Sequence, residues 1–451
     1  MIEQQIAKVT DREHGLKQHL TAGQMAMVAV GGSVGTGLLL GSGAAIQVAG
    51  PAAIVSYIIA ALICWTVALA LGEMSSVHPA AGSFGVYAEL YLNDWAGFVA
   101  RYGYWLSAIM AIGSEVVAAG TYMQVWYPKV PVVTWMMVFG LLLLLVNLFP
   151  VGNYGTFEYW FAFIKVITIF LFIVIGAALL MGTRIHPQYV ANGGFAPNGW
   201  RAAFITASFA LYSFLGIEMV AISSGEARSG AEVSKATSIS FALLVCLYVG
   251  AMAVLVGVMP WRDAGVAQSP FVRVFNFAGI PSAATIMNLV VLSAALSAAN
   301  ALLYVTSRTL FSLARSGHAP RGLGALNSQG VPIRAVVASM AGIVIAIFVQ
   351  KFAPEKAYLY IIGAALFGGM LAWLISLAAH VRFRKVITRE QLAVLKLRAP
   401  LGAAGSILGF VAITAAVMAT WWVPQFRITV VSAAPCLLVL SVAYWLVRKR
   451  A

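Results

Sequence analysis

The feature that most constrains this chain is a series of long apolar runs. A helix needs about 20 mostly apolar residues to cross the hydrocarbon layer of a membrane, because its backbone polar groups find no water there. Scanning the sequence for such runs predicts about twelve spans, and hence an all-α integral membrane protein. The spans cover residues 22 to 46, 51 to 74, 94 to 126, 132 to 149, 157 to 181, 201 to 222, 237 to 259, 284 to 308, 333 to 350, 357 to 379, 403 to 422 and 428 to 447.

The overall composition agrees with this class. Of the 451 residues, 61% are hydrophobic and 9% are charged, whereas a soluble globular protein has roughly 45–50% apolar and about 25% charged residues. A soluble enzyme and a disordered protein are therefore excluded. Cys64, Cys246 and Cys436 lie in apolar runs without pairing or metal-ligand spacing, so we expect them to be buried membrane residues, with no disulfide and no metal site.

The basic residues predict how the chain is oriented. The net charge is +14, which on a soluble surface would suggest a nucleic-acid partner. If the N-terminus is cytoplasmic, 19 of the 28 Lys and Arg residues lie in inside segments and 8 in outside segments, and Lys165 lies within a span. This asymmetry follows the positive-inside rule, so the charge predicts two cytoplasmic termini and no nucleic-acid partner.

The short connecting segments leave no room for a soluble domain, so we predict a single membrane domain. Residues 1 to 21 are polar, contain no signal-peptide core, and form a cytoplasmic N-terminal segment. Residues 22 to 181 and 201 to 379 are interpreted as two five-helix repeats. Residues 403 to 447 supply two additional helices.

Two spans in corresponding positions of these repeats are interrupted. In the first span, residues 31 to 37 read Gly-Gly-Ser-Val-Gly-Thr-Gly, and each Gly costs a helix roughly 1 kcal/mol relative to Ala. In the sixth span, residues 213 to 218 place a glycine beside a glutamate. Matched interruptions predict a secondary transporter in which broken half-helices meet at the bilayer midplane and bind the substrate. Free amides at one break attract a carboxylate and free carbonyls at the other attract an ammonium group, the two charges of an α-amino acid.

The glycine motif also fits two other patterns. Residues 31 to 35 fit the G-x-S-x-G hydrolase elbow, but that motif needs a strand-to-helix turn and a partner histidine. All six histidines lie at or outside the predicted span ends, which argues against an enzyme. The GxxxG spacing of Gly31 with Gly35, and of Gly37 with Gly41, is the serious alternative, because it favours close packing of a continuous helix.

A lysine at membrane depth is a functional hypothesis by default. Lys165 lies about eight residues into the fifth span, roughly 12 Å from its cytoplasmic end. Burial disfavours the charged form of a lysine, so Lys165 is the main candidate for a proton site. The alternative is a permanently charged residue that holds the carbonyls of the broken first span.

Four glutamates lie in or beside the spans. Glu115 lies near the middle of the third span, where it could bind a cationic group, relay a proton or satisfy a neighbouring helix break. Glu218 at the sixth-span interruption is either a structural cap or a coupling site. Glu73, at the inner end of the second span, is interpreted as an interfacial residue or an inner-gate partner. Glu226 is cytoplasmic and a candidate for a gate salt bridge.

Two aromatic side chains lie at the sixth-span interruption. Tyr212 and Phe214 either cover the substrate as a gate or pack within the bundle. Most other Trp and Tyr residues near span ends are expected to belong to the interfacial belt.

Several ordered segments carry a resemblance to a known family. The sequence resembles the amino acid/polyamine/organocation transporter superfamily, and more narrowly its bacterial amino acid permeases. The matching segments are GGSVGTGLLLGSG at 31 to 43, AGP at 49 to 51, LGEM and PAAGSFGVYAE within 71 to 89, NYGTFEYWFAFIKV at 153 to 166, SFLGIEMVAISSGEA at 213 to 227, SPFV at 269 to 272, and NALLYVTSRTLFSLARSGHAP at 300 to 320.

The resemblance implies the LeuT-like fold of two inverted five-helix repeats plus two helices, and uptake of amino acids or related amines that is usually coupled to protons. It implies that Lys165 takes the place of a sodium ion, and that Glu115 and Glu218 match acidic positions of this branch. The implied substrate-binding residues are Ser33, Val34, Gly35, Thr36 and Gly37 on the carboxylate side, and Tyr212, Phe214, Leu215, Gly216 and Ile217 on the amino-group side and gate.

One departure from the family affects the substrate. Where the aromatic permeases have a tyrosine seven residues before the third-span glutamate, this chain has Ala108. Aromatic specificity is therefore not transferred.

Together these observations predict a secondary active transporter of the bacterial inner membrane. It would import an amino acid or related amine by proton symport through alternating access, with the proton as coupling ion and no other cofactor. An exchanger or facilitator on the same fold, without net proton coupling, is the nearest alternative. A membrane-embedded amino acid sensor is a remote one.

Overall fold

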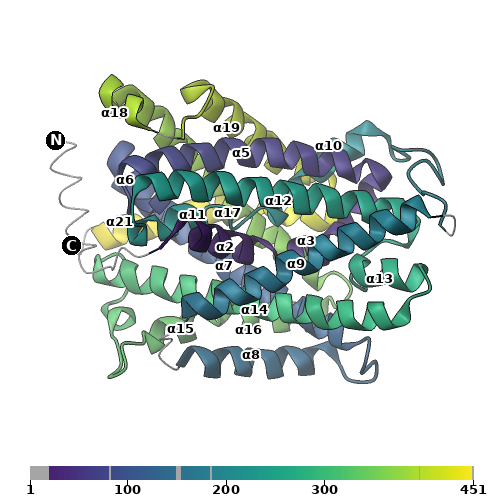
Figure 1. Cartoon of the computed structure of the whole chain (residues 1–451). Helices are drawn as coiled ribbons and strands as arrows, with labels where there is room; N and C mark the ends of the chain where they lie inside the picture. The colour runs from purple at the N-terminus through teal and green to yellow at the C-terminus, as the bar shows by residue number, and fades with distance from the viewer. Residues whose placement is uncertain (1–19, 81–82, 149–153, 183–184, 396, 449–451) are drawn as a thin grey trace.

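The computed structural model describes residues 20–80, 83–148, 154–182, 185–395 and 397–448. Most of the expected N-terminal segment, residues 1 to 21, lies outside the described residues. Within them all regular structure is helical, apart from one isolated parallel bridge between Leu20 and Ala227. The all-α prediction is confirmed, and Figure 1 shows the helices running along one common direction.

The first five predicted spans are observed, and the first is broken. The bounds are α2 Ala22–Ser33, α3 Thr36–Leu39, α4 Gly41–Ala49, α5 Ala53–Val77, α6 Ser83–Tyr91, α7 Asp94–Met123, α8 Val132–Leu148 and α9 Tyr154–Met181. The first span is thus divided into α2, α3 and α4, and the alternative of a continuous first helix is wrong.

The second half of the chain also contains a broken span, the sixth. The bounds are α10 Gly199–Ser213, α11 Met219–Ile222, α12 Gly230–Val258, α13 Pro270–Phe277, α14 Pro281–Arg315, α15 Ile333–Ser339, α16 Ala341–Phe352, α17 Ala357–Val386, α18 Arg389–Val394, α19 Gly402–Ala419, α20 Arg427–Val431 and α21 Ala433–Arg448. Short 3₁₀ turns include η1 Gly50–Ala52 and η2 Ser223–Glu226.

Nine helical stretches in the described residues are long and apolar enough to span a membrane. The first, fourth and sixth predicted spans are not among these nine stretches. The fourth, α8, has 17 residues, and the first and sixth are divided by their breaks. Side chains on the outside of the bundle are large and apolar, for example Leu141 and Phe170. In a membrane these side chains face lipid.

Several helix ends differ from the predicted ends. The helix α17 runs seven residues beyond the predicted end at residue 379, through Arg382 and Arg384, and α14 ends at Arg315 instead of residue 308. Basic residues in the last turns complement the negative end of the helix dipole, so they extend these helices. The short helices α6 and α13 were not predicted.

Two sets of segments lie at opposite ends of the bundle. Figure 1 places α6 and α18 at one end and α13 at the other. We call the first the inner end and the second the outer end, following the orientation that the loop charges predict. The first turn of α2 and the last turn of α21 both lie at the inner end.

The cysteines are not all buried. Cys64 is buried, but Cys246 is exposed on α12 and Cys436 is half-buried. The prediction of three buried cysteines is therefore wrong for Cys246, because an apolar run also supplies the surface that faces lipid.

Candidate functional site

A cavity lies between the two helix breaks. The room in it for water-sized molecules is about 40 Å³, enough for a few waters in this conformation. Eight of the expected site residues line it, and so does Ala108 of α7. These eight are Ser33, Gly35, Gly37, Glu115, Tyr212, Leu215, Gly216 and Glu218.

The remaining expected residues surround this cavity without lining it. Val34, Thr36, Phe214 and Ile217 are buried next to the lining residues, and Lys165 is buried in α9. The structure therefore brings the two predicted breaks together. The close approach is measurable at Gly216, where an added Cβ would lie 2.6 Å from Ser33 Oγ and 2.7 Å from the Ser33 backbone nitrogen.

The first break presents the start of a half-helix to Glu115. Val34 and Gly35 separate α2 from α3, and Thr36 is the first residue of α3. The Thr36 backbone N–H donates to the Glu115 carboxylate, with nitrogen–oxygen distances of 3.0 Å to Oε1 and 3.2 Å to Oε2. An added Cβ at Gly35 would lie 2.4 Å from Glu115 Oε1, so the glycine is needed for this approach. Of the roles considered for Glu115, the contact with a neighbouring break is the one observed.

Lys165 holds the other side of the same break. Its Nζ donates to the Gly31 carbonyl oxygen at 2.9 Å, and the side chain is buried. Lys165 also lies close enough to Glu115 to interact with it electrostatically. The helix α9 begins at Tyr154, so Lys165 is eleven residues from the inner end, deeper than the eight expected.

Two tyrosines complete the support of the first break. The Tyr248 hydroxyl on α12 donates to the Ser33 carbonyl oxygen at 2.7 Å, and the Tyr358 hydroxyl on α17 donates to the Thr36 carbonyl oxygen at 2.7 Å. Neither residue was singled out in the sequence, because a lone tyrosine in an apolar run carries no spacing signal. The break is thus held from α7, α9, α12 and α17.

The second break is closed by its own glutamate. Residues 214 to 218 separate α10 from α11, and Gly216 has φ of +114°, a conformation that side-chain-bearing residues rarely adopt. The Gly216 N–H donates to Glu218 Oε2 at 3.0 Å, and the indole N–H of Trp373 on α17 donates to the same oxygen at 3.2 Å. The Tyr104 hydroxyl also faces the Glu218 carboxylate. These contacts are those of a structural cap.

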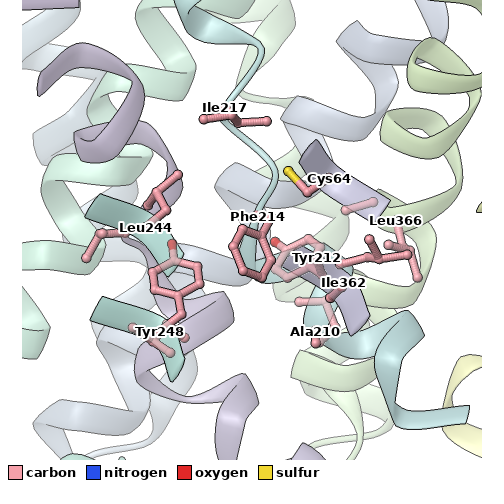
Figure 2. Packing of buried hydrophobic residues seen from close by; sticks show 14 of the residues in the cluster. Cys64, Ala210, Tyr212, Phe214, Ile217, Leu244, Tyr248, Ile362 and Leu366 are labelled. Atoms are coloured by element: carbon pink, nitrogen blue, oxygen red, sulfur yellow. The ribbon is translucent and has the colours of Figure 1, made fainter. Parts of the chain in front are cut away.

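The two aromatic gate candidates occupy different environments. Figure 2 shows Phe214 beside Tyr248, with ring centroids 4.9 Å apart, and Phe214 is fully buried. Tyr212 lines the cavity, and its hydroxyl lies 2.9 Å from Ser114 Oγ on α7. Phe214 is therefore packed within the bundle, whereas Tyr212 lines the cavity.

Two buried hydroxyls beside the first break have no hydrogen-bond partner among the described residues. They are Ser33 Oγ, which lines the cavity, and Thr36 Oγ1. A buried hydroxyl without a partner costs about 1–3 kcal/mol, so such groups are rare unless a ligand or water meets them. They mark the first break as a place where a polar ligand can bind. Within the described residues no group of three or more His, Cys, Asp or Glu could hold a metal ion.

Glu73 was expected to be an interfacial residue or a gate partner, but it is completely buried. It contacts His380 and Arg384 of α17. The placement of all histidines at or outside the span ends is therefore wrong for His380, because α17 extends past it.

Glu226, the candidate for a gate salt bridge, is exposed in η2 and interacts electrostatically with Arg308.

Comparison with known proteins adds an independent line of evidence. The amino acid permease family model matches residues 24–451. The γ-aminobutyric acid permease of Bacillus subtilis (strain 168) is 34% identical over 445 residues, covering 97% of this chain and 95% of that protein. The aromatic amino acid transport protein AroP of Escherichia coli (strain K12) is 34% identical over 450 residues, covering 98% of each.

A solved structure supports the fold. The crystal structure of an Eremococcus coleocola manganese transporter mutant, H236A, aligns with a TM-score of 0.61 and 11% identity, covering 95% of this chain and 94% of that chain. At this identity the likeness concerns the fold alone. The predicted fold class, a multi-pass helical membrane protein of the LeuT-like type, is confirmed.

Proposed function

The chain belongs to the amino acid permease family, whose members are transporters and not enzymes, and we propose that it imports an amino acid or related amine by proton symport through alternating access. We further propose that it lies in the bacterial inner membrane with both termini in the cytoplasm. The supporting observation is the excess of basic residues in segments at the inner end.

The substrate would bind in the cavity between the two breaks. Its carboxylate would meet the backbone of Ser33 to Gly37 and the unpartnered hydroxyls of Ser33 and Thr36. Its ammonium group would meet the unwound backbone of Tyr212 to Ile217. A helix start favours negative charge, because its N–H groups and dipole point at the ligand.

The observation that carries proton coupling is the contact between Thr36 N–H and Glu115. In this conformation the protein's own carboxylate occupies the place where a substrate carboxylate would bind. Two negative charges at one helix start repel each other strongly in a low-dielectric site. Protonation of Glu115 removes that repulsion, so proton and substrate bind together. Lys165 then supplies the positive charge that balances the substrate carboxylate.

Release would reverse these steps on the inner side. Loss of the proton restores the negative charge of Glu115, which competes with the substrate for Thr36 and favours departure of the substrate. The two breaks allow half-helices to tilt while the rest of each span stays helical. Tyr212 is the better placed of the two aromatic gate candidates, because it lines the cavity. For Glu218 the contacts favour the capping role over a coupling role.

The experiment is uptake into proteoliposomes with and without an imposed pH gradient, alkaline inside. A competition screen with all proteinogenic amino acids and γ-aminobutyrate first identifies the substrate. We expect the gradient to drive accumulation above the outside concentration, and a protonophore to abolish it. Full counterflow with no effect of the gradient on accumulation would contradict symport and support the exchanger or facilitator. Binding without any movement of substrate would support a sensor.

A further inference from the structure

A buried charged cluster lies near the inner end of the bundle, away from the cavity. Glu73 of α5 lies 2.6 Å from His380 Nε2 and accepts a hydrogen bond of 2.8 Å from Arg384 Nε, both on α17. A second Arg384 nitrogen also donates to Glu73. The backbone N–H of Ala399, in the segment before α19, donates to Glu73 Oε1 at 3.1 Å, and His380 Nδ1 lies 2.7 Å from Ser406 Oγ on α19.

The carboxylate and the imidazole of the cluster are enclosed, while the Arg384 side chain is 14% exposed. Both Glu73 and His380 are 0% exposed. Two turns further into the bundle, α5 and α19 touch so closely that a Cβ at Gly409 would lie 2.0 Å from Thr66 Oγ1. Separating α5 from α17 would leave a buried carboxylate without its donors, and breaking a buried ion pair in this way is strongly unfavourable.

The cluster joins two groups of helices that pack mainly among themselves. The helix α5 packs on α10 and α12, and α12 packs on α2, so these helices contain both broken spans or support them. The helix α17 packs most extensively on α7, which in turn packs on α14 and α16. The cluster is therefore a polar link across the boundary between the groups at the inner end.

A second polar link joins the same two groups of helices at the inner end, but it is exposed instead of buried. Glu226 of η2 interacts electrostatically with Arg308 of α14, whose guanidinium lies 3.2 Å from the centre of the Tyr304 ring. Glu226 is exposed to solvent. Exposed charges exchange protein contacts for water at little net cost, so this link can open and close.

We propose that Glu73, His380 and Arg384 form a fixed hinge that keeps the inner ends of α5, α17 and α19 together throughout transport. The inner side then opens between η2 and α14, where Glu226 faces Arg308, and not between α5 and α17. The three residues are positioning residues, since they do not line the cavity. This inference rests on the proposed alternating access, because a hinge has meaning only where two groups of helices move.

The test measures two distances between spin labels by double electron–electron resonance, on the full chain in proteoliposomes. Cys64, Cys246 and Cys436 are first replaced by alanine, and uptake by this background is checked. One labelled pair, Val77→Cys with Lys385→Cys, reports the hinge between α5 and α17. The other, Lys235→Cys with Arg315→Cys, reports the gate between α12, just after η2, and α14. Spectra are compared at acidic and alkaline pH, with and without phenylalanine or γ-aminobutyrate.

We expect the gate pair to shift between conditions while the hinge pair keeps one narrow distance. A hinge pair that shifts as much as the gate pair would overturn the hinge but leave the proposed transport intact. If neither pair shifts under any condition, alternating access is wrong, and the hinge with it.

A matched pair of variants adds a second readout. Glu73→Gln removes the charge at the hinge, and we expect it to broaden the hinge-pair distances and slow uptake by about tenfold or more. Glu89→Gln makes the same change in an ion pair outside the hinge, Glu89 with Arg101 at 2.6 Å, whose side chains are 17% and 14% exposed. It is expected to leave both readouts unchanged, because this pair does not join α5 to α17. Equal effects of the two variants, or no effect of Glu73→Gln on the hinge pair, would contradict the proposal.

Discussion

The two helix breaks differ in what holds them. The first break is held by side chains from four other helices, with Glu115, Lys165, Tyr248 and Tyr358 each bonded to its backbone. The second is capped mainly by Glu218, a residue of the break itself, which Trp373 supports. Only the first break is contacted by a lysine and a glutamate from other helices, whereas at the second Trp373 and Tyr104 contact Glu218, a residue of the break itself.

This difference indicates that the two breaks have different roles in transport. A break whose backbone is held from four helices responds when any of them moves or changes charge, so the first break is suited to couple protons to conformation. A break that is capped mainly by its own glutamate depends less on such changes, and its half-helices can still tilt about it. The second break is therefore suited to form one wall of the proposed substrate cavity. The following predictions test that contrast.

The largest effect is expected at the point where the breaks touch. Gly216→Ala forces a side chain into a φ of +114° and against Ser33. We expect a loss of at least about 2 kcal/mol of stability and no measurable uptake, because left-handed backbone and steric overlap both oppose the native structure. Thermal unfolding in detergent and proteoliposome uptake measure the two effects.

Gly23→Ala is the matched control for that variant. Gly23 lies in α2, and a Cβ there would meet nothing within 4 Å. Alanine favours a helix, so Gly23→Ala is expected to retain uptake and stability. Similar behaviour of the two variants would show that the contact between the breaks is unimportant.

The next effect concerns the first break alone. Lys165→Ala removes the donor to Gly31 and the positive charge beside Glu115. We expect gradient-driven accumulation to disappear, because substrate and proton no longer balance charge at the break. Lys351→Ala, at the exposed end of α16, is the control and should accumulate substrate normally. Unchanged accumulation by Lys165→Ala would refute the role of Lys165 in coupling.

The smallest effect is expected from removing one tyrosine hydroxyl at each break. Tyr248→Phe removes the hydrogen bond to the Ser33 backbone. Tyr57→Phe removes the hydrogen bond of 3.1 Å to the Ser213 side chain. Loss of one hydrogen bond is worth about 1 kcal/mol, so Tyr248→Phe should slow uptake roughly fivefold. Tyr57→Phe should change it less, because Ser213 Oγ is a side-chain group that can rotate to another partner. Initial uptake rates of the two variants measure this difference. If Tyr57→Phe lowered the uptake rate as much as Tyr248→Phe or more, the proposed difference between the breaks would be contradicted.

Much of the fold could be predicted from the sequence, because membrane spans and their interruptions are local signals. The glycines of residues 31 to 37 and the Gly216–Glu218 pair predicted both breaks. Helix ends were predicted less well, since the charged residues after residue 379 resemble a loop in composition but continue α17. The short helices α6 and α13 carry too few apolar residues to stand out from a connecting segment.

The contacts within the site could not be predicted in the same way. Glu115 lies 79 residues from Thr36, and nothing local indicates that a mid-span carboxylate caps a distant half-helix. The sequence did not indicate the cluster of Glu73 with His380, because the predicted span ends at residue 379, one residue before His380 and seven before the end of α17. The spacing of His380 and Arg384, four residues apart, was a usable signal, since it places both side chains on one helix face.

The most direct test of the account is accumulation by Glu115→Gln and Glu218→Gln, measured side by side in proteoliposomes under one imposed pH gradient. Glutamine keeps a hydrogen-bonding oxygen at each break but cannot exchange a proton. We predict that Glu115→Gln still exchanges substrate in counterflow yet does not accumulate it, whereas Glu218→Gln accumulates it at a reduced rate. Gradient-driven accumulation by Glu115→Gln at the level of the unmodified protein would contradict the account.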